Sequence, residues 1–391
     1  MNQYRWDEEV QVPCSIIRGG TSKGIFFLEN DLPSDLKKRE EVILRIFGSP
    51  DQRQIDGLAG ANSLTSKTAI VGPSLREDAD VDYTFGQVVI TEPKIDWVGN
   101  CGNISSGVGL FAVNEGLVKA VEPVTTVRIY NTNTGKLITA QVPVKNGRAV
   151  SKGDYRIPGV PSPGAKIELT FTRPDGSVTG KLLPTGNASD TIPLTDGRVF
   201  TVSIVDAANP VVFVRAHELG LKGTELPIQV EQMPEILAAL EEIRSRAAQT
   251  IGLVKQWQDA TKEVPAIPKI GFVSPAQDFV NPEGEMISKE TIDFTARLAS
   301  VQKMHRAYMV TGAICTAVAA NIPGTVVNEV LAQPGRLPRV RIGQPYGPMD
   351  VNVQMSEGAE GPVPGTVTVG RTARRLLKGA AFVPRDLFET P

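Results

Sequence analysis

The stretch Gly99-Asn100-Cys101-Gly102-Asn103-Ile104-Ser105-Ser106-Gly107-Val108-Gly109 decides how this chain is interpreted. A single thiol lies there among small residues, and glycine and asparagine let the backbone turn successive N–H groups toward one point. The apolar residues from Val108 to Val118 keep helical spacing. We therefore expect a helix that begins just after Cys101, whose positive end favours a thiolate and attracts an anionic substrate. The alternative is a small buried cysteine in a glycine-rich turn.

A second segment of small residues, Gly312 to Ala320, echoes the first in the other half of the chain. It contains Cys315 and leads to Val327-Asn328-Glu329, as the first segment leads to Val113-Asn114-Glu115. We interpret this echo as two related domains, in each of which a cysteine opens a small-residue helix whose N-terminus points into a shared cleft. The alternative is a chance similarity between two helices rich in alanine and glycine.

Length and charge limit the class of protein. A chain of 391 residues is too long for one compact core, which predicts two domains. The boundary is expected in the turn-rich stretch from Pro184 to Asp190, so the domains comprise residues 1–188 and 189–391. The formal net charge of −2 gives no basic surface of the kind that nucleic acids or anionic membranes require, so neither partner is expected.

Cysteine and histidine usage argues against metals and disulfides. Cys14, Cys101 and Cys315 lie far apart and form no CxxC pair, so neither a disulfide framework nor a zinc site is expected. Only His217 and His305 offer imidazole ligands. No apolar stretch is long enough to span a bilayer and the first residues are polar, which predicts a cytoplasmic protein.

The pattern of apolar residues predicts the secondary structure. Helical spacing predicts helices over residues 36–46, 231–256 and 292–309, in addition to the one after Cys101. His305 and Arg306 fall late in the last of these, where the sequence does not decide between cleft and solvent. Runs of β-branched and aromatic residues predict strands at residues 12–17, 24–27, 81–83, 87–90, 127–130, 137–142, 199–205 and 211–214.

The loop Arg18-Gly19-Gly20-Thr21-Ser22-Lys23-Gly24 follows the first predicted strand. It concentrates a guanidinium, an ammonium, two hydroxyls and exposed N–H groups, a combination that suits a carboxylate or a phosphate. It is not a Walker loop, because Ser22 and not glycine precedes Lys23. The alternative is an ordinary charged turn on the surface.

Lys67 lies among hydroxyl residues, just before the apolar strand Ala69-Ile70-Val71. Burial favours the neutral amine, which can accept a proton, so a partly buried Lys67 is a candidate acid or base. Most lysines are solvated and inert, which is the alternative.

Three further turns contain asparagine, at residues 131–135, 184–187 and 206–210. Each of them taken singly is an ordinary turn. Together they supply the polar lining that a substrate rich in carboxylates needs, which makes Asn187 and Asn209 candidates for binding it.

Seven strings spread over nearly the whole chain resemble the PrpF family of cofactor-independent isomerases, which are related in fold to diaminopimelate epimerase. The strings are Arg18-Gly19-Gly20-Thr21-Ser22-Lys23-Gly24, Ile46-Phe47-Gly48-Ser49-Pro50, Gln54-Ile55-Asp56-Gly57, Thr65-Ser66-Lys67, Val81-Asp82-Tyr83, Gly99-Asn100-Cys101-Gly102-Asn103 and Ile322-Pro323-Gly324-Thr325. Within the family, residues 45–51 and 101–109 are most similar to the 3-methylitaconate Δ-isomerases.

The resemblance implies an α/β (α+β) fold of two diaminopimelate epimerase-like domains. Each would be a curled, barrel-like and mostly antiparallel β-sheet around a central helix, with the active site in the cleft between the domains. It also implies that Lys67 and Cys101 transfer the proton with no cofactor and no metal. Cys315 resembles the second cysteine of the epimerases, but the family pairs a lysine with the first thiol, which puts a catalytic role for Cys315 in doubt. The residues expected to bind substrate are Arg18, Thr21, Ser22, Lys23, Asn62, Ser66, Gly102, Asn103, Asn187, Asn209, Thr311 and Gly312.

The implied reaction shifts a C=C bond by 1,3-proton transfer in an unsaturated di- or tricarboxylate, which is the only partner expected. The leading substrate is 3-methylitaconate, with 2-methylaconitate and 4-oxalomesaconate as alternatives. A remote alternative makes Cys101 the nucleophile of an acyl transferase or hydrolase, although neither histidine lies in a motif that supplies its base. A third hypothesis is a carboxylate-binding protein without catalysis. The sequence leaves open whether identical chains associate.

Overall fold

The computed structural model describes residues 8–358 and 361–388, whose contacts divide the chain into two compact units. The first unit contains residues 8–98, 103–169 and 371–388, and the second contains Gly99–Gly102 and Thr170–Gly370. The folding domains predicted over residues 1–188 and 189–391 stay a prediction. The contacts add that the last strand of the chain lies with the first unit.

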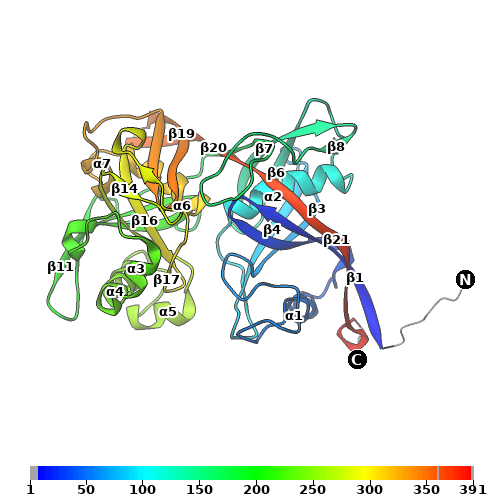
Figure 1. Ribbon diagram of the computed structural model, residues 1–391. Helices are drawn as coiled ribbons and strands as arrows, with labels where there is room; N and C mark the ends of the chain where they lie inside the picture. The colour runs from blue at the N-terminus through cyan, green and yellow to red at the C-terminus, as the bar shows by residue number, and fades with distance from the viewer. Residues whose placement is uncertain (1–7, 359–360, 389–391) are drawn as a thin grey trace, which may run out of the picture. The chain divides into compact units, whose positions relative to one another are not determined.

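The first unit is built on a mixed sheet with the strand order β21-β1-β2-β3-β4-β6-β7 (Figure 1). The pairs β2/β3 and β4/β6 are parallel and the others are antiparallel. The strands are β1 (Glu9–Gly19), β2 (Ser22–Leu28), β3 (Lys67–Pro73), β4 (Val81–Val88), β5 (Ile95–Asp96), β6 (Val124–Asn131), β7 (Lys136–Lys145), β8 (Arg148–Ala149) and β21 (Ala373–Pro384). The helices are α1 (Leu36–Phe47) and α2 (Gly102–Asn114), of which the first residue, Gly102, is counted with the second unit.

The second unit has the strand order β10-β11-β12-β13-β16-β18-β19-β20, with β12/β13 and β16/β18 parallel. Its strands are β10 (Asp190–Pro193), β11 (Val199–Ala207), β12 (Asn209–Arg215), β13 (Lys269–Pro275), β14 (Phe279–Val280), β15 (Met286–Ile287), β16 (Phe294–Ser300), β17 (Lys303–Met304), β18 (Arg339–Gln344), β19 (Gly347–Gly358) and β20 (Gly361–Arg371). Its helices are α3 (Pro227–Glu231), α4 (Pro234–Thr250), α5 (Ala260–Glu263), α6 (Val310–Ala320) and α7 (Val326–Glu329). Strand β9 (Ile167–Thr172) begins in the first unit and ends in the second.

The two units repeat one plan. From β1 to β7 and from β11 to β19, neighbouring main strands pair in the same alternation of antiparallel and parallel. The repeat extends to side chains, because Arg128 binds Asp80 in the first unit as Arg341 binds Asp293 in the second. In both pairs the guanidinium donates to the carboxylate at 2.6 Å, and the backbone N–H of the same arginine donates to it at 2.7 Å. The shared plan supports the interpretation of two related halves.

Each unit has a helix that is buried on every side. All positions of α2 from Gly102 to Val113 are buried, and so is all of α6. Small residues let the strands approach α2 this closely, since a Cβ at Gly107 would lie 2.7 Å from the ring of Phe26 and one at Gly109 would lie 2.7 Å from Val142. The predicted central helix after Cys101 is confirmed.

Helix α1 shows how local sequence sets its ends. Its first turn is capped by Asp35, whose side chain accepts from the N–H of Lys38 at 2.9 Å. Its last turn ends at Gly48, whose φ of 76° is a left-handed conformation that glycine adopts without strain. The helix predicted over residues 36–46 is therefore confirmed.

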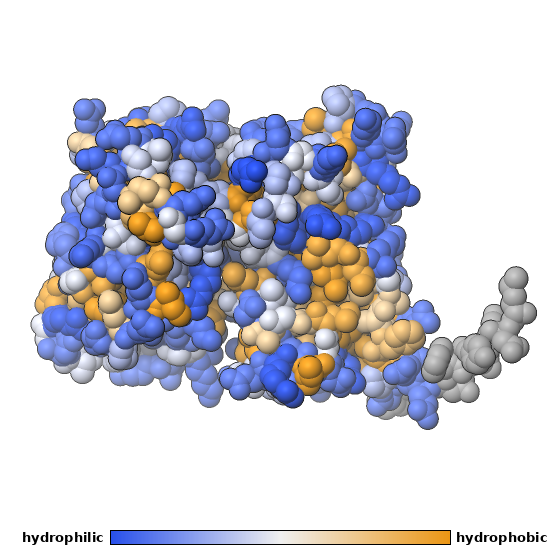
Figure 2. Space-filling model, in the orientation of Figure 1, coloured by the Kyte–Doolittle hydropathy of each residue, from blue (hydrophilic) through white to orange (hydrophobic). Residues whose placement is uncertain are grey.

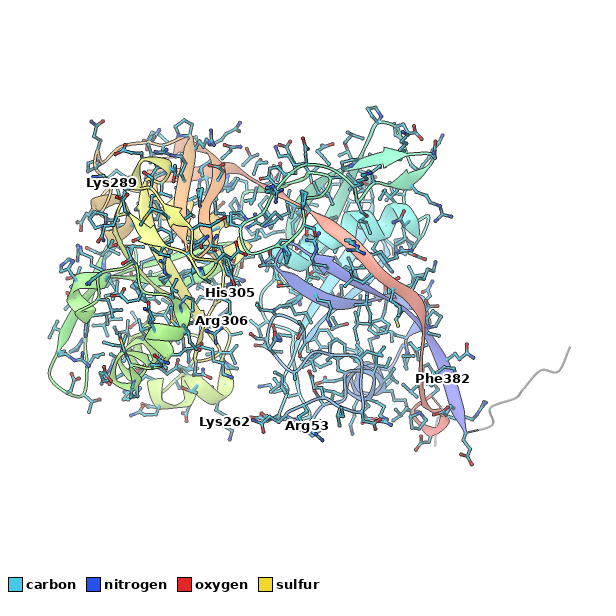
Figure 3. All side chains as sticks on the ribbon, in the orientation of Figure 1. Arg53, Lys262, Lys289, His305, Arg306 and Phe382 are labelled. Carbon is cyan, nitrogen blue, oxygen red and sulfur yellow. The ribbon has the colours of Figure 1, made fainter. Side chains whose placement is uncertain are left out.

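The helix predicted over residues 292–309 is wrong. Residues 294–300 form β16 and residues 303–304 form β17, and the next helix begins only at Val310. The apolar residues Ile292, Phe294, Ala296 and Leu298 in fact alternate, as in a strand, and pairing with β13 and β18 fixes them as one. His305 and Arg306, labelled in Figure 3, thus lie between β17 and α6. The helix predicted over residues 231–256 is present but shorter, because α4 covers only Pro234–Thr250.

Strand β21 returns the chain to the first unit and pairs along β1, as the red and blue strands of Figure 1 show. Hydrophobic residues gather on the first unit in the region where Figure 1 draws these two strands (Figure 2). Leu376, Leu377 and Phe382 of β21 are each about half exposed. Among the described residues, no helix is both long and apolar enough to cross a membrane.

Candidate active site

The turn between β1 and β2 is held against the first turn of α2. Asn103 accepts from the N–H of Thr21 at 3.4 Å and donates to the Thr21 hydroxyl at 3.1 Å. Gly20 has a φ of 52°, and a Cβ there would lie 2.0 Å from Oδ1 of Asn103. The structure therefore brings the predicted residues Thr21 and Asn103 together, and glycine is required at position 20.

The predicted carboxylate ligand Arg18 is engaged by its own turn and by Thr372. Its guanidinium donates to the carbonyl of Gly20 at 2.9 Å, and to the carbonyl and hydroxyl of Thr372 at 3.1 and 3.0 Å. Burial lowers the pKa of Arg18, and the nearby charge of Arg374 lowers it further. In this arrangement Arg18 stabilises the turn that would present Thr21.

Lys23 and Ser22 complete this turn. Within residues 8–358 and 361–388, the structure gives the half-buried ammonium of Lys23 no hydrogen bond or ion pair. Ser22 is 3% exposed, and its hydroxyl has no hydrogen-bond partner in the same part of the chain. Arg371 is a further cation beside this turn that the sequence did not single out. Its Cδ would lie 3.3 Å from a Cβ at Gly20. Burial lowers the pKa of Arg371 to about 10.

Lys67 is the first residue of β3 and is 8% exposed. It therefore lies where the polar loop ends and the strand begins, as predicted. Its Nζ lies 2.5 Å from Oε1 of Gln87, its partner across the β3/β4 pair, and 5.4 Å from the ring centroid of Phe85. An acceptor oxygen and an aromatic face both stabilise an ammonium, whereas burial favours the amine. These opposed influences suit a group that gains and loses a proton. Sequence reasoning missed Gln87, which only the pairing register of β3 and β4 indicates.

The loop before Lys67 contains two more predicted ligands. Ser66 is buried, and its hydroxyl donates to the side-chain oxygen of Gln54 at 2.7 Å. Asn62 is exposed and folds back on its own turn, donating to the carbonyl of Gly60 and accepting from the N–H of Leu64. Both side chains therefore organise this loop.

Cys101 is half-buried and directly precedes α2, so the predicted position at a helix start is confirmed. N–H groups in the first turn of a helix have no partner within the helix and carry its positive end. A Cβ at Gly102 would lie 2.5 Å from Cγ1 of Val310, so within the second unit Gly102 packs directly against the first residue of α6. The thiol is thus presented beside N–H groups that can stabilise a negative charge.

Three more predicted ligands lie near this segment in the second unit. Asn209 is 1% exposed and its amide contacts Asn100 and the hydroxyl of Thr311. Gly312, the next residue of α6, packs so closely that a Cβ there would lie 2.2 Å from Leu298. Asn187 is different, because it is exposed and binds Asp190 within its own turn at 2.8 Å.

The two other cysteines are sealed from solvent. Cys315 is completely buried in the middle of α6, where its Sγ donates to the carbonyl of Val205 at 3.1 Å. The prediction that Cys315 opens a helix is therefore wrong, because α6 begins five residues earlier, at Val310. Burial raises the pKa of both Cys14 and Cys315. In the described part of the chain, no group of three or more His, Cys, Asp or Glu side chains is placed to hold a metal ion.

The predicted site residues fall in both units. Those in the first unit are Arg18, Thr21, Ser22, Lys23, Asn62, Ser66, Lys67 and Asn103. Those in the second are Cys101, Gly102, Asn187, Asn209, Thr311 and Gly312.

Comparisons with known proteins extend over nearly the whole chain. The chain is 48% identical over 379 residues to 3-methylitaconate isomerase of Eubacterium barkeri, covering 97% of this chain and 98% of the relative. It is 38% identical over 399 residues to 2-methyl-aconitate isomerase of Shewanella oneidensis, covering 98% of this chain and 100% of the relative. These proteins and the chain thus correspond from end to end.

Solved structures confirm the predicted fold class. A crystal structure of methylitaconate-delta-isomerase has a TM-score of 0.81 and 47% sequence identity, with 98% of each chain covered. A hydroxyproline epimerase from Agrobacterium vitis, at 15% identity, has a TM-score of 0.53 over 98% of this chain and 94% of that one. The latter likeness shows that the epimerase-like fold is shared. The model of the PrpF protein family matches residues 9–384. Given this match and the relatives named as isomerases, the chain belongs to the PrpF family and is an isomerase.

Proposed function

We propose that this protein is a cofactor-independent isomerase that shifts the C=C bond of an unsaturated dicarboxylate of the 3-methylitaconate type. The observation that carries the proposal is the 48% identity, along the whole chain, to a protein named 3-methylitaconate isomerase. The Lys67 and Cys101 environments support it, because each offers a group able to carry a proton.

The reaction conserves all atoms and electrons. A base takes a proton from the carbon next to the methylene-bearing carbon, and the C–H electron pair delocalises into a dienolate. An acid returns a proton to the methylene carbon, which leaves an internal C=C bond. No redox step occurs, so the protein has to supply two proton-carrying groups and a means of stabilising the dienolate.

In this proposal Lys67 and Cys101 are the proton-carrying groups. The buried ammonium of Lys67 has an acceptor in Gln87 that steadies it in the protonated state. The Cys101 thiol adjoins the start of α2, beside the N–H groups of the first helical turn. A positioned acid or base contributes roughly 10²- to 10⁴-fold to the rate.

The substrate carboxylates are assigned to the β1/β2 turn and the first turn of α2. Lys23 supplies the cation and Thr21 a hydroxyl already ordered by Asn103. Backbone N–H groups of Gly102 and Asn103 would stabilise charge as it develops on the dienolate. Donors of this kind contribute on the order of 3 kcal/mol to transition-state stabilisation.

A cis-trans isomerisation of 2-methylaconitate is the second candidate, supported by the 38% identity to 2-methyl-aconitate isomerase. It can proceed through the same kind of delocalised carbanion, so the same residues would serve it. A cytoplasmic location stays a prediction.

Incubation of the protein with unsaturated carboxylates in deuterated water, followed by NMR, tests the proposal. The panel is 3-methylitaconate, 2-methylaconitate and 4-oxalomesaconate. We expect the shifted alkene to appear from 3-methylitaconate, with deuterium at the carbon that receives the proton. Binding without product or exchange would support the non-catalytic hypothesis, and a covalent adduct on Cys101 by mass spectrometry would support acyl transfer.

A further inference from the structure

The side chain of Asn209 is engaged on three sides. Asn209 is the first residue of β12, and its Nδ2 donates to the carbonyl of Asn100 and to Oγ1 of Thr311, both at 3.0 Å. Its Oδ1 accepts from the N–H of Asn100 at 3.3 Å. An asparagine amide has two hydrogens to donate. Both go to protein acceptors, so none is left for a carboxylate.

The target of this amide is the backbone next to Cys101. Oδ1 and Nδ2 bind the N–H and the C=O of the same residue, Asn100. The Asn100 carbonyl belongs to the planar peptide group that ends at the Cα of Cys101. Fixing that oxygen therefore fixes the plane from which the Cys101 side chain projects.

Close packing on both sides leaves this segment little freedom. Gly99 has a φ of 83°, and a Cβ there would lie 2.9 Å from Oδ1 of Asn209. On the other side, Gly102 packs against Val310. Asn100 and Asn209 are 6% and 1% exposed, so water does not compete strongly for their hydrogen bonds.

We propose that Asn209, anchored by Thr311, is a positioning residue that holds the Asn100–Cys101 peptide and thereby aims the Cys101 thiol. This inference deepens the proposed function and rests on it only for the role of the thiol. It replaces the expectation that Asn209 and Thr311 bind the substrate directly, because direct binding would require the amide to release one of its present partners.

The second unit contains a matched control for Asn209. Asn321 is also 1% exposed, donates from Nδ2 to the carbonyls of Ala317 and Leu337, and accepts at Oδ1 from the N–H of Leu337. Like Asn209→Ala, Asn321→Ala removes two donated hydrogen bonds and one accepted from a backbone N–H, but its partners do not adjoin Cys101. Thermal unfolding is expected to show a similar loss of stability in Asn209→Ala and Asn321→Ala.

The first measurement is the rate at which iodoacetamide alkylates Cys101, followed from pH 6 to 10 by peptide mass spectrometry. Cys14 and Cys315 are buried, so the modified peptide is expected to be the one that contains Cys101. We expect the pH profile of alkylation to change in Asn209→Ala, with a rate difference of about threefold or more, and to remain within about twofold of the wild type in Asn321→Ala. This readout needs no substrate, so it remains informative if the proposed isomerase activity fails.

The second measurement separates kcat from KM. Misplacing a reacting group by about 1 Å can cost roughly 10²-fold in rate, so we expect Asn209→Ala to lower kcat about 10- to 100-fold and change KM by less than about threefold. If Asn209→Ala does not fold, Thr311→Val provides the test, with Thr316→Val on the same helix as its control. We expect Thr311→Val to lower kcat about threefold or more and to alter alkylation. A rise in KM with unchanged alkylation would overturn the inference and make Asn209 a substrate ligand. Equal effects in each variant and its control would also overturn it, because they would show a structural role with no special effect on Cys101.

Discussion

The side-chain oxygen of Gln87 lies 2.5 Å from the Nζ atom of Lys67. Gln87 is not free to rotate away, because its Nε2 donates to the carbonyl of Ser66 at 2.8 Å and to that of Ser63 at 3.3 Å. With both amide hydrogens committed, the oxygen must face the lysine. The β3/β4 register that pairs Lys67 with Gln87 thus creates a fixed acceptor for one of the two proposed proton carriers.

Replacing this acceptor should change the acid-base behaviour of Lys67. Gln87→Leu removes an oxygen that stabilises the ammonium, so the limb of the rate profile that reports Lys67 should move to lower pH. Measurement of kcat against pH checks this. Gln141→Leu, on β7 of the same unit, is the control and should leave the profile in place. A Gln87→Leu profile that matches the wild type would contradict the assigned role.

Arg18 and Lys23 should respond differently to removal. Arg18→Leu breaks one hydrogen bond within the turn, to the Gly20 carbonyl, and two that hold the turn to Thr372, which should lower stability by about 1–3 kcal/mol. Lys23→Met should leave stability nearly unchanged and raise KM about tenfold, because the ammonium is available to a carboxylate. Denaturant unfolding and steady-state kinetics separate the two effects. The reverse pattern would mean that Arg18, and not Lys23, contacts the substrate.

The buried thiol of Cys315 should be dispensable for the reaction. Cys315→Ala leaves a small cavity in α6 that should cost about 1 kcal/mol in stability, with kcat within about twofold of the wild type. Burial raises the pKa of Cys315, so it should also resist alkylation at pH 8 while Cys101 reacts. A loss of kcat at full stability would show that the second thiol takes part after all.

Acid should weaken the first unit through Asp80. Burial tends to raise the pKa of this carboxyl, but hydrogen bonds from Arg128 lower it overall. A folded-state pKa below the unfolded value adds stability that is present above about pH 4 and is lost as the pH falls further. Because Arg128 is half exposed, we expect the contribution to be about 0.5–1 kcal/mol after solvent screening.

The variant Asp80→Asn tests this contribution. It should be less stable than the wild type at pH 7 and should lose less stability between pH 5 and 3, as followed by urea unfolding. Asp350→Asn, which removes an exposed pair with Arg339, serves as the comparison and should have a smaller effect. Parallel pH curves for Asp80→Asn and the wild type would contradict the prediction.

Local sequence predicted the parts of the fold that local chemistry controls. Helix α1 has its cap at Asp35 and its stop at Gly48, and α2 follows a glycine and asparagine turn beside Cys101, so both helices could be expected from the chain alone. Strand β16 could not be separated from a helix so easily. Its alternating apolar residues include good helix formers such as Ala296 and Leu298, and its partners β13 and β18 decide its conformation.

The candidate site was harder to predict, because it depends more on contacts between distant parts of the chain. Lys67 and Cys101 could be singled out by their neighbours in sequence. Gln87 could be found only with the register of β3 and β4, and Asn209 reaches Asn100 across 109 positions. The error at Cys315 concerns a local boundary instead, because the sequence did not show that α6 begins as early as Val310, five residues before this thiol.

The measurement that tests the central claim most directly is hydrogen exchange between substrate and deuterated water, followed by NMR in the wild type, Lys67→Ala and Cys101→Ser. The account predicts that the wild type exchanges the allylic hydrogen of 3-methylitaconate and that each variant, still folded, loses about 10²-fold or more of that rate. Exchange at the wild-type rate in either variant would remove that residue from the mechanism and contradict the account.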